Sequence, residues 1–202
     1  MTVTDGRTQR RQRTHDALVA AGVVLLEEGR SSATIEEITG RAGVGFGSFT
    51  NHFASREAFF GEAMLAVLDR YAGMLEAATA GIERPDERFA TSFRLVGRLA
   101  RSQPALLAPF DTAGMDILFS DRGLRTLALE DLRAGVDQGC FAPGDPEVLM
   151  LAVGGTLLAL IRHLRDDAEV DAAQVTDDLV ERLLLLLGVE RASASRLAHA
   201  PL

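Results

Sequence analysis

Residues 34–57 read TIEEITGRAGVGFGSFTNHFASRE, and this stretch decides the fold. Thr34, followed three positions later by a glutamate, forms a capping box, which predicts that a helix begins here. Gly43 can adopt the left-handed conformation that ends a helix. A second short helix over 45–52 would bury two phenylalanines that lie four positions apart on one face. Two short helices joined in this way form a helix-turn-helix, whose second helix fits the major groove of DNA.

The motif resembles the DNA-binding signature of the TetR (tetracycline-repressor-like) family of bacterial regulators. Three positions differ from the family pattern. Gly45 stands where a serine or threonine hydroxyl is common, and Phe46 stands where polar or basic side chains are common. Thr50 replaces a frequent tyrosine. These departures leave the expected fold unchanged and imply fewer phosphate contacts than in other members. The matching positions are Thr34-Ile35, Ile38, Arg41-Ala42-Gly43-Val44, Gly47, Phe49 and Phe53-x-Ser55-Arg56-Glu57.

The resemblance implies an all-α protein of about nine helices. Residues 1–56 are expected to form a three-helix DNA-binding domain, and residues 57–202 a helical domain for ligand binding and dimerisation. The implied function is a ligand-responsive transcriptional regulator, most simply a repressor that a small apolar molecule releases from a palindromic operator. A ligand would act by moving the fourth helix and changing the spacing of two recognition helices.

Nine residues are expected to face DNA. Ser48, Asn51 and His52 can hydrogen-bond to base edges or phosphates, and Phe46 can pack on a thymine methyl group. Arg56 is the expected phosphate contact, with a surface ion pair as the alternative. The full set is Thr34, Gly45, Phe46, Gly47, Ser48, Thr50, Asn51, His52 and Arg56.

Helical periodicity extends through the rest of the chain, and no segment has the alternation of a strand. A first helix over 8–28 places Ala17, Ala21, Val24 and Leu25 on one side. Further helices are predicted over 55–79, 86–102, 104–118, 121–138, 145–165 and 171–187.

Charge is unevenly distributed along the chain. Residues 1–56 carry seven Arg and six acids, a net charge of +1, whereas the remainder carries 14 Arg and 23 acids, a net charge of −9. Phosphates would attract the N-terminal part and repel the acidic remainder, which favours one orientation on DNA. Arg7, Arg10, Arg11 and Arg13 can either reach DNA or form a solvated basic segment.

The last two predicted helices carry more apolar surface than one partner helix can cover. Such a surplus favours a four-helix bundle between two copies of the chain, a homodimer that the resemblance also implies. The alternative is that both helices are central in a monomer. The residues expected at the dimer interface are Val148, Leu151, Gly154, Gly155, Leu158, Leu179, Leu183 and Leu187.

An apolar ligand pocket is expected among the fourth to eighth helices, although the sequence does not identify the effector. Each of its candidate residues can equally be plain core. They are Met64, Leu68, Tyr71, Phe89, Phe93, Phe110, Met115 and Phe119, with Asp111, Asp116 or His163 as polar anchors.

Other classes of protein are disfavoured. The four histidines lack metal-ligand spacing, Cys140 is alone, and no catalytic motif or cofactor site can be assembled, so we expect neither an enzyme nor a metal protein. The polar, basic start does not read as a signal peptide, and the apolar run 148–161 is shorter than a membrane span. A cytoplasmic protein is therefore expected. The remaining alternative is a helical interaction protein without sequence-specific DNA binding.

Overall fold

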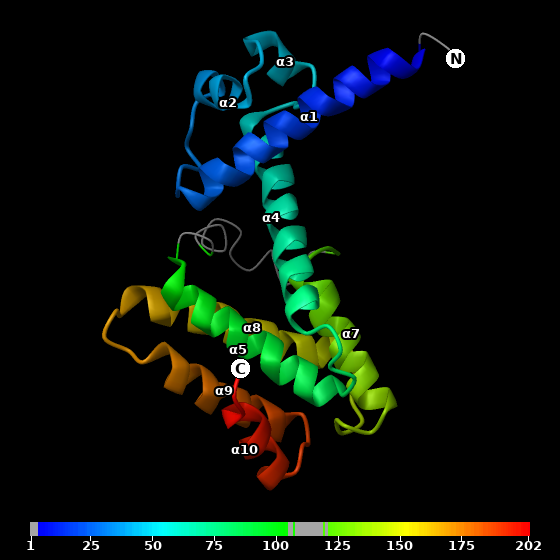
Figure 1. Ribbon diagram of the computed structural model, residues 1–202, viewed down its shortest axis with the longest axis vertical. Helices are drawn as coiled ribbons and strands as arrows, with labels where there is room; N and C mark the ends of the chain where they lie inside the picture. Colours follow the sequence, from blue (N-terminus) through cyan, green and yellow to red (C-terminus); the bar gives the residue numbers. More distant parts are fainter. Residues whose placement is uncertain (1–3, 105–106, 108–118, 120) are drawn as a thin grey trace. The chain divides into compact units, whose positions relative to one another are not determined.

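The computed structural model describes residues 4–104, 107, 119 and 121–202. Every regular element in these ranges is helical, which confirms the predicted all-α class (Figure 1). The described helices are α1 (Thr4–Glu27), α2 (Ile35–Ala42), α3 (Phe46–Thr50), α4 (Arg56–Ala78), α5 (Pro85–Ser102), α7 (Leu124–Asp137), α8 (Pro146–Asp166), α9 (Ala172–Leu186) and α10 (Arg191–His199).

The chain divides into two compact units, Met1–Val67 and Leu68–Leu202, which we call the N-terminal and C-terminal units. The sequence led us to expect a boundary after residue 56, before α4, whereas the compact units meet within this helix. The reason is aromatic packing, because the ring of Phe59 lies 5.4 Å from that of Phe49. The first turns of α4 therefore belong to the core of the N-terminal unit.

The helix-turn-helix forms as its local sequence predicts. The Glu37 backbone N–H donates to Thr34 Oγ1 (3.3 Å), and the Thr34 N–H donates to Glu37 Oε2 (2.7 Å), which completes the capping box. Gly43 ends α2 with a φ of 67°. Phe49 of α3 is fully buried beneath this turn, together with Ile38 of α2.

Helix α1 supports the motif, and of the face expected to be buried, Ala21 and Leu25 are buried and Ala17 is half-buried. The fully buried residues are Leu18, Leu25 and Leu26, whereas Val24 is exposed. Gly22 allows α4 to approach α1, because a Cβ at this position would lie 2.7 Å from both Ala63 and Phe59 side-chain atoms. The buried stripe thus follows the contact with α4.

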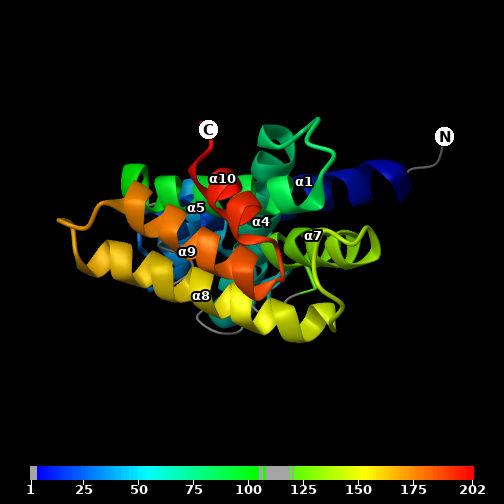
Figure 2. The same cartoon turned by 90° about the horizontal axis from the view of Figure 1, so that it is seen from below.

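The C-terminal unit is assembled around α5, which contacts α7, α8, α9 and α10. Figure 2 shows α8 and α9 running side by side. Helices α5 and α9 approach closely at Gly97, where a Cβ would overlap Thr176 Oγ1 and lie 2.5 Å from Thr176 Cγ2. The absence of a side chain at this position therefore sets the separation of the two helices.

A buried arginine joins three helices of this unit. Arg94 Nε lies 2.9 Å from Asp177 Oδ1, and Arg94 Nη2 donates to the Ala200 carbonyl at 2.7 Å. Burial raises the pKa of the Asp177 carboxyl, but hydrogen bonds from Arg98 and Arg94 outweigh it and hold the pKa below its usual value. The C-terminal end of α10 is thereby fixed against α5 and α9.

Two stretches differ from the sequence expectation. Helix α10 was not predicted, although Glu190 caps its start and Ala194 and Leu197 bury one side of it. The helix predicted over 104–118 lies almost wholly outside the described residues.

Among the described helices, α8 alone has the length (21 residues) and mean hydropathy (1.6) that a membrane span requires. Its apolar side chains Met150, Val153, Leu160 and Leu164 are buried within the C-terminal unit. A third of the apolar window of α8 is buried in this way.

Candidate DNA interface and effector cavity

Helix α3 buries one side and presents the other to solvent. Phe49 and, just after the helix, Phe53 are buried, whereas Phe46 is 53% exposed. The expected DNA-facing residues Gly45, Gly47, Thr50 and Asn51 are likewise exposed, and Ser48 and His52 are half-buried. The helix therefore offers polar groups and two glycines to a partner that approaches its outer face.

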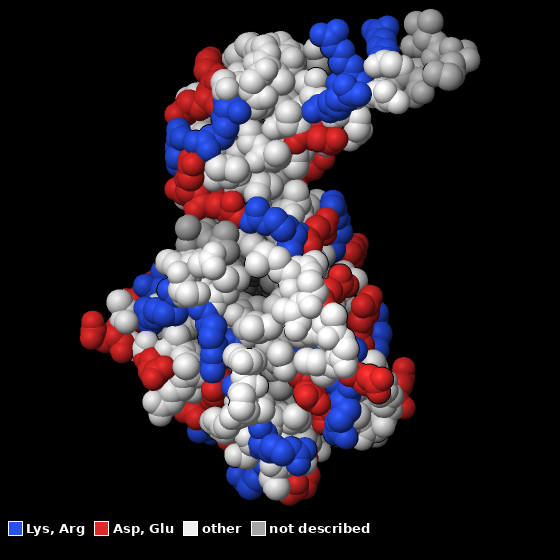
Figure 3. All heavy atoms as spheres, viewed as in Figure 1, with Lys and Arg blue, Asp and Glu red and all other residues white. Residues whose placement is uncertain are grey.

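A groove runs between the start of α1 and this outer face. Figure 3 shows basic side chains gathered along the N-terminal part of α1. The groove thus combines cations from α1 with hydrogen-bonding groups from the helix-turn-helix. Its main lining residues are Arg7, Arg10, Arg11, Ser48, Asn51 and His52.

The two histidines beside this groove are close together. The His15 and His52 rings are centred 5.6 Å apart, and His15 also stacks on Phe53 at 5.3 Å. His15 Nε2 lies 3.0 Å from Glu62 Oε1 of α4. Partial burial, followed by His15 and Arg11, lowers the pKa of His52, which favours a neutral ring in the free protein.

Three other expected DNA contacts already have partners within the N-terminal unit. Thr34 Oγ1 serves the capping box, and Thr50 Oγ1 donates to the Gly47 carbonyl at 3.2 Å. Arg56 Nη1 donates to the Ser32 carbonyl at 3.0 Å, which ties the start of α4 to the turn before α2. The phosphate roles of these residues stay predictions.

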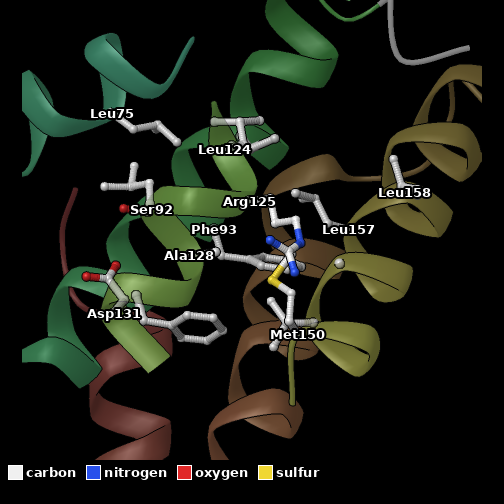
Figure 4. Close-up of a pocket in the computed structure, with 15 residues that line it drawn as sticks. Leu75, Ser92, Phe93, Leu124, Arg125, Ala128, Asp131, Met150, Leu157 and Leu158 are labelled. Carbon is white, nitrogen blue, oxygen red and sulfur yellow. The ribbon is translucent and has the colours of Figure 1, made fainter. Parts of the chain in front are cut away.

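The C-terminal unit contains a cavity of about 70 Å³ with mainly apolar walls (Figure 4). The predicted residues Phe89 and Phe93 both line it. Its full lining is Leu75, Phe89, Ser92, Phe93, Val96, Leu124, Arg125, Leu127, Ala128, Asp131, Met150, Val153, Gly154, Leu157 and Leu158. A neighbouring cavity of about 150 Å³ shares Leu75, Val96 and Leu124 and includes the predicted Tyr71.

The remaining predicted pocket residues lie elsewhere. Met64 is buried in the N-terminal unit, and Leu68 is buried against Gly123. His163 and Phe119 are exposed, so neither side chain reaches the cavity. Phe110, Met115, Asp111 and Asp116 lie outside the described residues.

Sequence reasoning missed the polar residues of the cavity wall, which are Ser92, Arg125 and Asp131. The positions 89, 92, 93 and 96 follow the i, i+3, i+4, i+7 spacing of one helix face, so Ser92 could have been found from the phenylalanines. Asp131 and Arg125 come from α7, whose rotation toward α5 the sequence does not reveal.

Asp131 is buried, Ser92 and Arg125 are half-buried, and the hydrogen-bonding groups of the three are only partly satisfied. Asp131 accepts a hydrogen bond from Arg88 Nε, and burial still raises the pKa of its carboxyl. Arg125 Nη2 donates to Glu147 Oε2 at 2.5 Å. Within the part of the chain that the structure describes, the buried atoms Ser92 Oγ and Arg125 Nε have no hydrogen-bond partner.

The residues expected at the dimer interface divide into two groups. Val148 and Leu151 of α8 are 60% and 52% exposed, and Leu186 of α9, which was not in the expected set, is 56% exposed. Gly155 has open space around it. In contrast, Gly154 and Leu158 line the cavity, Leu183 and Leu187 are buried within the chain, and Leu179 is half-buried.

The described ranges contain no group of three or more His, Cys, Asp or Glu residues that could hold a metal ion. Cys140 is a half-buried free thiol.

Comparisons with known proteins agree with this architecture. The sequence profile described as "Bacterial regulatory proteins, tetR family" matches residues 17–63, and that described as "Tetracyclin repressor-like, C-terminal domain" matches residues 84–200. The HTH-type transcriptional repressor KstR2 of Mycolicibacterium smegmatis is 24% identical over 181 residues, which cover 85% of this chain and 88% of that protein.

Two solved structures extend the likeness to the whole fold. The structure of RolR in complex with resorcinol is 26% identical, with a TM-score of 0.80 over 96% of this chain and 97% of that chain. KstR2 of Mycobacterium tuberculosis is 20% identical, with a TM-score of 0.54 over 86% of this chain and 94% of that chain. With the two profiles covering both units, the chain belongs to the TetR family of bacterial transcriptional regulators.

Proposed function

We propose that this regulator is a homodimeric repressor that binds a palindromic operator and is released by a small molecule. The observation that carries the proposal is the groove in which arginines of α1 lie beside the exposed polar face of α3. Cations beside a helix that fits the major groove combine non-specific attraction to phosphates with contacts to base edges. A regulator of this kind would act in the cytoplasm.

Within this groove we assign different roles to the two sets of side chains. Arg7, Arg10 and Arg11 would neutralise phosphates, because guanidinium groups make charge-assisted hydrogen bonds to them. Ser48 and Asn51 would read base edges, since hydroxyl and amide groups match base donors and acceptors.

Dimerisation would place two such grooves on one operator. The support is the exposed apolar side of α8 and α9, where Val148, Leu151 and Leu186 are all more than half exposed. Covering apolar surface is the main driving force of association, and a two-fold axis would pair α8 and α9 with their copies.

The effector would occupy the cavity of the C-terminal unit. RolR has been solved with resorcinol, and KstR2 is described as a ketosteroid transcriptional regulator. Helix α4 supplies Phe59 to the N-terminal core and Leu75 to the cavity wall, so a ligand touching Leu75 acts on a helix that both units share. Release requires that the ligand bind the DNA-free state more tightly than the DNA-bound state.

Selection from a random DNA library, followed by gel-shift titration, tests the DNA-binding part. We expect an enriched palindrome bound by two protomers, and an altered motif with Asn51→Ala. Arg11→Gln should weaken binding to all sequences alike and reduce the salt slope of log K by about 1.8 per dimer, at roughly 0.9 per phosphate contact.

Arg191→Gln provides the matched control, because Arg191 is an exposed arginine of α10 in the other unit. It should leave the affinity and the salt slope unchanged. If no motif is enriched and the arginine variants behave alike, the chain is a helical interaction protein and the proposal is wrong.

A further inference from the structure

We propose that Phe46 recognises the C5 methyl group of one thymine in each operator half-site, and that this methyl group sets the base preference there without a hydrogen bond. The inference rests on the proposed DNA-binding function and deepens it by naming the chemical group that one residue reads. The sequence permits such a contact, and three structural observations favour it: the place of Phe46 on α3, its exposure, and the open space at the glycines on either side of it.

Phe46 lies where a recognition helix meets base pairs. It is the first residue of α3, the second helix of the helix-turn-helix. In proteins of this kind the N-terminal residues of the recognition helix contact base edges in the major groove. Phe49 anchors α3 in the core with 1% exposure, whereas the Phe46 ring is 53% exposed. The fold therefore leaves the Phe46 ring at the surface where DNA would lie.

The glycines that flank Phe46 are not required by the protein itself. Neither Gly45 nor Gly47 has a positive φ, so an alanine could adopt the same backbone conformation. A Cβ added at either position would meet no atom of the chain within 4 Å. Glycine also disfavours a helix relative to alanine, and packing within the chain does not explain this cost at Gly47. The missing side chains therefore leave room for an external partner to approach the ring closely.

The chemistry of the ring selects the base. Phe46 carries no hydrogen-bonding group, so it cannot read the donors and acceptors of the base edges. The apolar group that base pairs present in the major groove is the thymine C5 methyl. An apolar ring placed over the polar edge of another base would leave buried groups without hydrogen-bond partners, which is unfavourable. Thymine is therefore the base that this residue favours.

The surroundings of Phe46 favour DNA over an apolar protein surface as its partner. Three arginines of α1 line the groove together with Ser48 and Asn51, and such a positive, polar surface attracts phosphates. In the described part of the N-terminal unit, Val24 of α1 is the one other large apolar side chain that is exposed. A lone ring does not form the extended apolar patch that protein partners cover.

Replacing thymine by uracil in the selected operator tests the inference, because this change removes the C5 methyl group alone. Each thymine is replaced in turn, in both half-sites at once, and the affinity is measured by gel-shift titration. We expect one position at which uracil lowers the affinity about fifteenfold, because burial of one methyl group corresponds to about fourfold in each half-site. Phe46→Ala should bind the thymine operator more weakly and lose this response to uracil. If uracil has no effect at any position, or if Phe46→Ala responds as the parent chain does, the inference is overturned.

A second replacement separates the methyl group from the rest of thymine. Cytosine and 5-methylcytosine have the same hydrogen-bonding edge and differ by the C5 methyl group. At the sensitive position, 5-methylcytosine should therefore bind the parent chain about fourfold more tightly per half-site than cytosine does. Phe46→Ala should not distinguish the two bases. An equal gain for both chains would show that another residue reads the methyl group and would refute the assignment.

Control variants test the ring and the glycines separately. Phe119→Ala removes a phenylalanine that is 65% exposed in the C-terminal unit, and it should keep the response to uracil. Gly47→Ala should melt no lower than the parent chain, yet weaken operator binding about tenfold or more because its Cβ would enter the space that DNA needs. Gly61→Ala, at an exposed glycine of α4 with nothing within 4 Å of the added Cβ, is its matched control. Equal affinities of the two alanine variants would contradict the close approach on which the Phe46 contact depends.

The same experiments distinguish the inference from the proposed function. If an operator is selected and Arg11→Gln weakens its binding while uracil has no effect, the Phe46 assignment fails and the DNA-binding function stands. If no sequence is enriched from the library, the DNA-binding function fails, and the Phe46 assignment fails with it.

Discussion

Replacing Gly97 by alanine tests how the C-terminal unit is packed. A Cβ added to Gly97 of α5 would overlap Thr176 Oγ1 of α9 and lie 2.5 and 2.8 Å from Thr176 Cγ2 and Cβ. Ordinary contacts of a Cβ begin at 3.4 Å, so the overlap amounts to about 1 Å. Thr176 cannot turn away easily, because it is β-branched and its Oγ1 donates to the Ala172 carbonyl at 2.6 Å.

The magnitude follows from two opposing effects. Overpacking of a core costs about 1–3 kcal/mol, and three close atoms on a rigid side chain place Gly97→Ala at the upper end. Alanine is a better helix former than glycine by about 0.8–1 kcal/mol. The net loss of unfolding free energy is therefore about 2 kcal/mol, or about 4–8 °C in Tm for a chain of this length.

Thermal and urea unfolding of five chains measures this effect: the parent, Gly97→Ala, Gly73→Ala, Thr176→Ala and the Gly97→Ala/Thr176→Ala double variant. Gly73→Ala is the matched control, because Gly73 is an exposed helical glycine with nothing within 4 Å of the added Cβ, and it should melt at or above the parent temperature. In a Thr176→Ala background, Gly97→Ala should cost at least about 1 kcal/mol less, because the two nearest atoms are gone. An equal cost in both backgrounds, or a Tm for Gly97→Ala within 1 °C of that for Gly73→Ala, would refute the reasoning.

Two further predictions concern the N-terminal unit and the dimer. Because the pKa of His52 is lower in the folded chain than in the unfolded chain, the unfolded chain binds the proton more readily. The contribution of neutral His52 to stability should therefore be complete above about pH 6.5 and should decrease as the pH falls below this value. His52→Gln should flatten this decline in urea midpoints between pH 7.5 and 5.5, and an unchanged slope would count against the assignment. For the dimer, Gly155→Ala adds a Cβ that meets no atom of its own chain, so the protomer should fold normally while a close α8 contact is blocked. Sedimentation equilibrium should show a dissociation constant raised tenfold or more, and an unchanged constant would place Gly155 outside the interface.

The helix-turn-helix was predictable because its determinants are local. The capping box at Thr34, the left-handed Gly43 and the buried Phe49 are each specified by neighbours within a few positions. The boundary between the units was less predictable, since it depends on Phe59 packing against rings that precede it in the chain. Such contacts depend on how helices meet, which periodicity alone does not specify.

The residues of the cavity were harder to predict from the sequence than the boundary between the units. Phe89 and Phe93 were expected because aromatic residues at helical spacing favour a buried face. Ser92, Arg125 and Asp131 were not, because polar residues are assigned to the surface unless their burial is known. Four helices contribute to this wall, and their relative rotation is a tertiary property.

The Arg94 contact has a consequence for how sequences of this type can diverge. Arg94 binds the carboxylate of Asp177 and the backbone carbonyls of Leu197 and Ala200. A carbonyl oxygen is present whatever side chain its residue carries, so the last turn of α10 can change its sequence and keep its anchor. Arg94 and Asp177 should therefore be retained or lost together among relatives, whereas positions 197 and 200 should vary with no constraint from Arg94.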